Sequence, residues 1–135
     1  MNVYKTKKQK ITGSSFKEVN RVADRIFKQI KSRTKRTPYI RSKYFKGQKI
    51  FLNIFWRHLF DKRENDRVRR LKFFDCAMDL IRNTTYEPTT KENPNRKSEL
   101  LHRFAGLTSK NEIFYIQIKE DKATERKDLL SVFPE

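Results

Sequence analysis

Cysteine, glycine, histidine and long apolar runs are all scarce in this 135-residue chain, and each scarcity excludes a class of protein. The single cysteine, Cys76, has no second cysteine for an intrachain disulfide, which is typical of a reducing compartment. With 3 glycines there is no glycine-rich phosphate loop, so nucleotide-hydrolysing folds are excluded. The 2 histidines lie far apart and no paired-cysteine motif is present, so no metal site is predicted.

No apolar stretch is long enough for a signal peptide or a membrane span. A cytoplasmic protein without a membrane partner is therefore expected, and no cofactor is expected. Acidic residues are few, since 16 Asp and Glu stand against 33 Lys and Arg, for a net charge of +17. Residues 98–135 hold 6 Lys and Arg against 7 Asp and Glu, so residues 1–97 carry +18. Such a field indicates a polyanionic partner, most simply nucleic acid.

The length predicts a single domain, residues 1–135, with a modest core. The predicted fold class is α+β, with N-terminal helices packed on a C-terminal antiparallel β-meander. Four regions follow one another: a basic arm and first helix (1–49), an apolar segment and second helix (50–83), a loop (84–97) and an antiparallel sheet (98–135).

The two predicted helices rest on apolar spacing. Ser15 and Glu18 form a capping box before a helix over residues 16–32. The second helix is predicted over residues 61–83. The arm that precedes the first helix is either a short edge strand or a solvated basic segment.

The apolar segment of residues 50–60 predicts a short strand followed by a short helix. His58 lies within it, beside Trp56 and Phe60. A lone histidine among aromatic residues is interpreted as a core or boundary residue rather than a reactive group.

Residues 31–49 contain many cations and no acid, with Tyr39 and Tyr44 interleaved. Sites that follow a nucleic-acid backbone combine cations with stacking aromatics in this way. A disordered basic linker is the alternative. The candidate nucleic-acid-binding residues here and elsewhere are Arg33, Lys35, Arg36, Arg41, Lys43, Arg67, Arg70 and Arg103.

The C-terminal segment contains short runs rich in Ile, Phe, Tyr and Val, separated by turn-forming residues, which predicts a strand meander. Pairing Gly106 with Ile113 places His102 opposite Gln117. Closing the second loop so that Glu120 meets Asp128 brings a serine to the same side. One sheet face is then predicted to carry a cluster of reactive groups: His102, Tyr115, Gln117, Lys119 and Ser131. A one-residue slip in register separates them.

This cluster suits RNA cleavage without a metal ion. The 2′-hydroxyl attacks its own phosphodiester, so the protein supplies a proton acceptor, a proton donor and cations for the developing charge. His102 is the candidate for proton transfer, as base or as acid, because histidine titrates near neutrality. Lys119 is the candidate for stabilising the charged phosphorane, and Ser131 or Tyr115 for orienting the phosphate.

Two alternatives stay open. Gln117-x-Lys119 resembles the Gln-x-Lys variant of the restriction-endonuclease-like metal nucleases, which also need an acidic ligand, here Glu99 or Glu112. The other alternative is a non-catalytic nucleic-acid-binding protein in which the sheet is only structural.

The order of elements carries a further resemblance over residues 61–135. Helices followed by strands containing His-Arg-Phe, Tyr-Ile-Gln-Ile-Lys and Ser-Val-Phe-Pro resemble the barnase–EndoU–RelE-like (BECR-fold) ribonucleases. The resemblance implies a toxin-like endoribonuclease that uses His102, Lys119 and Ser131, with Arg103 as an added candidate. It also implies RNA as substrate, including ribosome-bound mRNA, and an antitoxin or immunity protein as partner. The basic N-terminal half and the lack of a glutamate base on the sheet face depart from that group.

Overall fold

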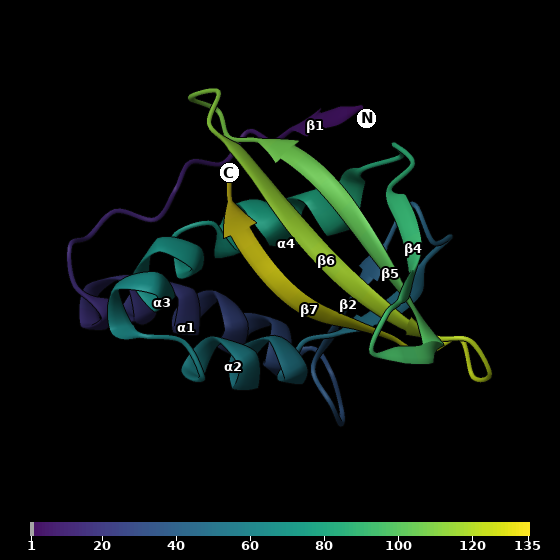
Figure 1. Cartoon of the computed structure of the whole chain (residues 1–135). Coiled ribbons are helices and arrows are strands. Elements are labelled where there is room, and N and C mark those ends of the chain that lie inside the picture. Colours follow the sequence, from purple (N-terminus) through teal and green to yellow (C-terminus); the bar gives the residue numbers. More distant parts are fainter. Residues whose placement is uncertain (1) are drawn as a thin grey trace.

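The computed structural model describes residues 2–135, which form four helices and a seven-stranded sheet (Figure 1). The predicted α+β class is confirmed. The sheet crosses the front of the molecule in Figure 1, with α4 behind it and α1, α2 and α3 gathered at one side. No helix within this part of the chain combines the length and the apolar character that crossing a membrane requires.

The helices are α1 (Phe16–Ser32), α2 (Asn53–Phe60), α3 (Glu64–Leu71) and α4 (Phe74–Asn83). The predicted start of the first helix is confirmed, because the Ser15 hydroxyl accepts a hydrogen bond from the Glu18 N–H at 3.2 Å. The predicted strand and helix over residues 50–60 are also present, as β3 (Gln48–Phe51) and α2.

The single helix predicted over residues 61–83 is wrong, because the chain forms α3 and α4 with a break at residues 72–73. The break sends two adjacent aromatic side chains in different directions. Phe73 stacks on Phe114 with ring centroids 5.5 Å apart, while Phe74 stacks on Phe55, also at 5.5 Å. Neighbouring residues of a continuous helix point about 100° apart, so burying both rings against different partners favours the interruption.

The remaining strands are β1 (Val3–Lys5), β2 (Tyr39–Ser42), β4 (Thr89–Asn93), β5 (Arg96–Leu107), β6 (Ile113–Asp121) and β7 (Lys127–Pro134). The predicted meander is present, since β5, β6 and β7 pair in antiparallel order. The sheet as a whole is mixed, because β1 joins β5 in parallel and β3 joins β7 in parallel. Its strand order is β1-β5-β6-β7-β3-β2, with β4 also on β5.

Two segments without a predicted strand pattern become strands. The predicted loop over residues 84–97 contains β4, which forms a hairpin with β5. The basic stretch of residues 31–49 contains β2 and the start of β3. Most residues of β4 are exposed, and its backbone pairs with β5. Its sequence therefore has no alternation of apolar and polar residues from which a strand could be predicted.

The meander divides its side chains between two faces. The inner face packs on the helices through core residues that include Phe104, Phe114, Ile116, Ile118 and Leu129. The outer face carries the intervening residues of the same strands. Every second residue of β6 is buried, from Phe114 to Ile118, which confirms the predicted alternation of that strand.

The predicted register of the first hairpin is wrong by one residue. Gly106 lies opposite Phe114 rather than Ile113, and His102 lies opposite Ile118 rather than Gln117. A Cβ atom added to Gly106 would lie 2.5 Å from the Phe114 ring, so the missing side chain makes room for that ring. This packing favours the observed register and moves His102 to the inner face.

The second hairpin differs from prediction at one end only. Glu120 lies opposite Lys127 rather than Asp128, whereas Ser131 lies opposite Gln117 as predicted. The two facts are compatible because Leu130 is an extra residue in β7, a β-bulge between the pairs at Leu129 and Ser131.

Candidate active site

A row of polar side chains crosses the outer face where β5, β6 and β7 lie side by side. Arg103 lies opposite Gln117, and Gln117 lies opposite Ser131. Directly opposed residues in antiparallel strands have Cβ atoms about 5 Å apart. The polar row of Arg103, Gln117 and Ser131 therefore places a guanidinium, an amide and a hydroxyl within reach of one small ligand.

An aromatic pair lies directly beside the polar row. Tyr115 and Phe133 are cross-strand partners whose rings stack with centroids 5.5 Å apart and planes inclined by 30°. The Arg103 guanidinium lies 5.3 Å from the Phe133 ring centroid, and the Arg70 guanidinium lies 5.8 Å from it. Two cations over a stacked pair form a surface that suits both a base and its phosphate.

Helix α2 brings a histidine to the β7 end of the polar row. His58 is exposed and lines a small hollow, of about 10 Å³, together with Lys62, Arg70 and Ser131. The hollow lies between α2 and β7, which pack against each other through buried Phe55 and Leu59. Residues that carry an imidazole, a hydroxyl and two cations thus line one small hollow at the edge of the outer face, together with the apolar residues Phe55, Leu59, Leu130 and Val132.

Arg70 is held in place by α3. Its Nε atom donates to Asp66 Oδ2 at 3.1 Å, and Asp66 also accepts from Arg69 at 2.9 Å. Burial works to raise the pKa of the Asp66 carboxyl, but the hydrogen bonds and charges of the two arginines outweigh it and hold that pKa below its usual value. Asp66 therefore stays ionised and fixes the Arg70 side chain near Phe133.

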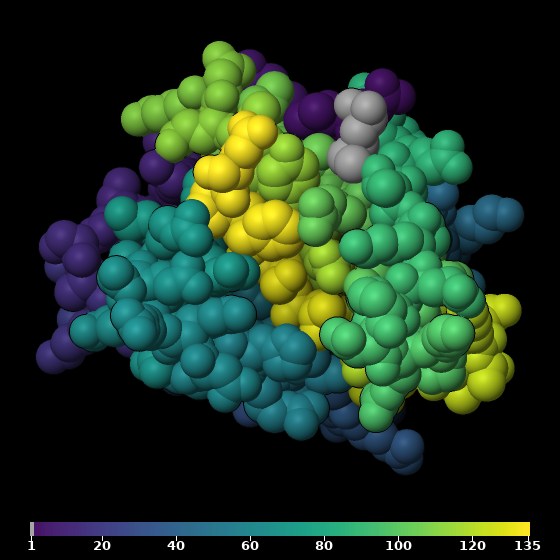
Figure 2. Space-filling view, viewed as in Figure 1, coloured from purple at the N-terminus to yellow at the C-terminus, as the bar shows by residue number. Residues whose placement is uncertain are grey.

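A second hollow adjoins the other end of the polar row. It measures about 150 Å³ and is lined by Arg103 and Gln117 with Thr89, Lys91 and Leu101. In Figure 2 the β7 surface, in yellow, lies recessed between the teal α2–α3 region and the green β4 region. The outer face is therefore hollowed at the polar row rather than flat.

The structure brings together three of the five predicted reaction-site residues. Tyr115, Gln117 and Ser131 lie in the polar row or beside it. Lys119 is on the same face, one cross-strand pair further along, with its Nζ atom 3.4 Å from Glu99 Oε2. His102 is not with them.

His102 lies on the inner face with only 6% of its surface exposed. Its Nδ1 atom is 2.8 Å from Thr90 Oγ1, and its Nε2 atom is 2.8 Å from Glu120 Oε1. Lys127 Nζ lies 3.6 Å from the same Glu120 oxygen and donates to Gln48. We call Thr90, His102, Glu120, Lys127 and Gln48 the buried polar network. Both ring nitrogens of His102 already have partners, so a ligand on the outer face cannot reach them.

The predicted nucleic-acid-binding residues occupy several surfaces. Arg33, Lys35 and Arg36 are exposed in the segment after α1, and Arg41 and Lys43 are exposed on β2 and just beyond it. Arg103 is exposed on the outer face, and Arg70 reaches it. Arg67 instead donates to the carbonyl oxygens of Phe60 and Lys62 at the end of α2.

Sequence reasoning missed His58 and Lys62. His58 is not a core residue, because its side chain is exposed, and its position beside the buried stripe of α2 is that of a boundary residue. The spacing of apolar residues in α2 could have shown that His58 lies outside the core. Phe55 and Leu59 are four residues apart and bury one stripe of the helix, and His58 falls at the margin of that stripe.

The acidic side chains near the sheet are engaged with cations. Glu99 accepts hydrogen bonds from Asn93 and Lys119, while Glu112 pairs with Lys10 at 2.6 Å. Across residues 2–135, no cluster of three or more His, Cys, Asp or Glu side chains is arranged to hold a metal ion.

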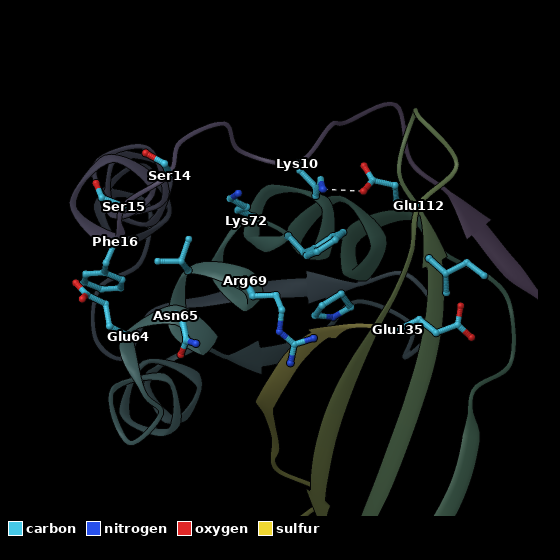
Figure 3. A pocket seen from close by; sticks show the side chains of 14 residues that line it. Lys10, Ser14, Ser15, Phe16, Glu64, Asn65, Arg69, Lys72, Glu112 and Glu135 are labelled. Carbon is cyan, nitrogen blue, oxygen red and sulfur yellow. Dashed lines mark ion pairs between the residues drawn. The ribbon is translucent and has the colours of Figure 1, made fainter.

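A larger cleft lies elsewhere, between the start of α1, α3, the start of β6 and the end of β7. Its volume is about 800 Å³, and Figure 3 shows Lys10 directed toward Glu112 across one side. Its charged lining residues are Lys10, Arg69 and Lys72 with Glu64, Glu112 and Glu135. Charges of both signs offset one another there, so this cleft suits a polyanion less than the outer face does.

Comparison with known proteins adds no family assignment, since no family model, curated protein or solved structure matches the chain.

Proposed function

We propose that this protein is a metal-independent endoribonuclease whose reaction takes place at the polar row. The observation that carries the proposal is the meeting of His58, Arg70 and Ser131 around one hollow at the end of that row. His58 replaces His102 in this proposal, because His102 is buried on the opposite face.

The arrangement supports a reaction in which the RNA supplies its own nucleophile. The 2′-oxygen forms a bond to phosphorus, the bond from phosphorus to the 5′-oxygen breaks, and the 5′-oxygen takes up a proton. His58 accepts the proton of the 2′-hydroxyl, and solvent protonates the leaving oxygen. The products are a 2′,3′-cyclic phosphate and a free 5′-hydroxyl.

The cations and the hydroxyl have separate parts in this scheme. Arg70 and Arg103 stabilise the negative charge that develops on the phosphoryl oxygens. Ser131 donates a hydrogen bond that orients the phosphate. The stacked rings of Tyr115 and Phe133 hold an adjacent base. Lys119 lies further from the hollow and contributes to the positive field with its Glu99 partner.

The resemblance to the barnase–EndoU–RelE-like ribonucleases belongs to this proposal. Helices that precede an antiparallel meander support it, while the mixed seven-stranded sheet departs from a barnase-like arrangement. In keeping with the resemblance, we propose RNA, including ribosome-bound mRNA, as the substrate. A toxin-like role in the cytoplasm, with an antitoxin or immunity protein as partner, follows from the same resemblance.

The test is cleavage of total RNA by the purified protein in EDTA, with end-group analysis of the products. We expect cleavage that survives EDTA and leaves 2′,3′-cyclic phosphates. His58→Gln should abolish most of it, whereas Arg57→Gln, on the same turn of α2 but outside the hollow, should not. Cleavage that EDTA abolishes would instead support the metal-dependent alternative around Gln117 and Lys119.

A non-catalytic nucleic-acid-binding protein is the second candidate, favoured by the aromatic pair and its two arginines. It predicts tight RNA binding without cleavage under any ionic condition. In that case Phe133→Leu should weaken binding while His58→Gln leaves it unchanged.

A further inference from the structure

A second group of aromatic rings and cations lies on the outer face beyond β7, on β2 and β3. Phe51 lies opposite Asp128 of β7, and Tyr39 lies opposite Phe51. Since Asp128 pairs with Lys119, these rings are on the same face as the polar row. The two ring centroids are 6.0 Å apart, with planes inclined by 68°.

Each of these rings is accompanied by cations. The Arg126 guanidinium lies 4.1 Å from the Phe51 ring centroid, and Lys49 Nζ lies 4.7 Å from the centroid of Tyr39. Arg41 lies 5.5 Å from the Tyr39 ring as well. Asp128 accepts from Arg126 at 3.3 Å, which holds the guanidinium in its position near the ring.

An open cleft of about 500 Å³ adjoins these side chains. Its lining contains three exposed cations and one carboxylate around the Phe51 ring: Arg41, Lys49, Arg126, Glu125 and Phe51. Lys127 also lines the cleft, but its side chain is buried in the polar network of the inner face. We call this cleft the β2–β3 cleft. The side chains of Arg41, Lys49 and Arg126 are exposed and those of Tyr39 and Phe51 are half-buried, so charge and part of the aromatic surface are available to a ligand.

We propose that the β2–β3 cleft binds unpaired nucleotides of a single-stranded RNA, with a base stacked at Phe51 and Tyr39 and phosphates beside Arg41, Lys49 and Arg126. Aromatic side chains stack only on bases whose flat faces are accessible, as they are in single strands. The bases of a duplex already stack on one another, so a duplex uses the cations but not the rings.

This inference deepens the proposed function, on which the choice of RNA rests. Phe51 pairs with Asp128, and Ser131 lies three residues further along β7. Because of the bulge at Leu130, these two residues of β7 lie opposite Lys119 and Gln117, which are two residues apart on β6. At about 3.3 Å per residue, the two points are about 7 Å apart along the strand. The cleft therefore holds the strand within a few nucleotides of the bond that the polar row is proposed to cleave, and selects unpaired RNA.

The test measures binding separately from cleavage. Fluorescence anisotropy with a labelled single-stranded RNA and a duplex of the same length gives two dissociation constants for each variant, in the His58→Gln background. Replacing Phe51 and Tyr39 by leucine keeps apolar bulk and removes the rings. We expect single-strand affinity to fall roughly five- to hundredfold, and duplex affinity to change little.

Phe60→Leu is the matched control, because Phe60 is exposed and, like Phe51, has an arginine over its ring, Arg67 at 5.5 Å. Phe60 packs on Phe16 of α1 and does not line the β2–β3 cleft, so its replacement should leave both affinities unchanged. If the double variant melts below the wild type, Tyr39→Leu alone decides the question.

Two outcomes would overturn the inference. One is an unchanged single-strand affinity, and the other is an equal loss for single strand and duplex. A protein that cleaves RNA yet shows either result keeps its proposed function and loses this subsite. A protein that prefers single strands through Phe51 and Tyr39 but never cleaves retains the subsite and loses the enzymatic proposal.

Discussion

On the inner face of the sheet, His102 has a hydrogen-bond partner for each ring nitrogen and almost no contact with solvent. At the edge of the outer face, His58 is exposed beside a serine and two cations. The same imidazole group thus occupies two opposite environments. A histidine whose nitrogens are already bonded in the interior supports packing, whereas one with accessible nitrogens can exchange protons with a ligand.

Replacing each histidine by glutamine should give the largest difference between these regions, in cleavage rate and in melting temperature. We expect His58→Gln to slow RNA cleavage by roughly a hundred- to ten-thousandfold, because a proton-transfer group is lost. His102→Gln should retain the wild-type rate and lower the melting temperature, because an amide replaces only part of the buried polar network. Initial rates and thermal melts of both variants provide the measurement. A folded His102→Gln variant without activity would reverse the assignment.

Removing the Arg103 guanidinium from the polar row should have the next largest effect on the cleavage rate. Arg103→Gln removes a cation from the proposed transition state, so cleavage should slow by roughly a hundredfold. Tyr115→Phe is the control, because it keeps the stacked ring and loses only a hydroxyl bonded at 3.4 Å to Glu135. Single-turnover rates with saturating enzyme separate the chemical step from binding. Equal rates for wild type and Arg103→Gln would remove Arg103 from the site.

Within the buried polar network, Glu120→Gln should change stability rather than cleavage. The Glu120 side chain is 15% exposed and faces both His102 and Lys127. Neutralising it leaves Lys127 buried without its counter-charge, and removing one partner of a buried pair costs about 3 kcal/mol. Urea unfolding at neutral pH measures the loss. Glu92→Gln, which breaks an exposed pair with Lys122 in the neighbouring hairpin, should cost less than about 1 kcal/mol.

Protonating Asp66 in acid should weaken its hold on Arg70 at the outer-face site and destabilise the folded protein. This is the smallest of the expected effects. The pKa of Asp66 is lowered in the folded protein, so its contribution to stability is complete above the ordinary value of 3.8. That contribution is lost as pH falls through the lower folded pKa. The Asp66 side chain is 28% exposed, so the contribution is modest. Asp66→Asn should lower the free energy of unfolding at neutral pH. The difference in this free energy between wild type and variant should become smaller in strong acid, and urea unfolding at several pH values would measure it.

Local patterns in the sequence predicted the elements that are defined by short-range chemistry. Ser15 caps α1, and alternation in β6 separates Phe114, Ile116 and Ile118 from Tyr115 and Gln117. These features depend on residues close together in the chain. The α+β class and the C-terminal meander follow from them.

Features that depend on distant partners were not predicted. The register of β5 and β6 depends on the fit of the Phe114 ring over Gly106 and against the core, which no local pattern reveals. The strand β4 has a polar sequence, and its pairing with β5 is supported by side-chain contacts such as Thr90 to His102, which involve residues that are not neighbours in the chain. The meeting of His58 with Ser131 requires α2 to pack on β7, although the two residues are far apart in sequence. The candidate site was therefore half predicted, on β6 and β7, while the predicted His102 lies on the other face of the sheet.

The bulge at Leu130 has a consequence for how this site could arise and be lost. Along a regular strand, side chains alternate between the two faces, so Asp128 and Ser131, three residues apart, would point to opposite faces. The additional residue at Leu130 restores the phase, because Asp128 lies opposite Lys119, Ser131 lies opposite Gln117, and both face outward. If β7 continued past Leu129 without a bulge, Leu130 would lie opposite Gln117 and Ser131 would point toward the helices. Deleting the Leu130 codon would remove the bulge and still leave Ser131 opposite Gln117. The serine therefore reaches the outer face through the bulge as much as through its own identity.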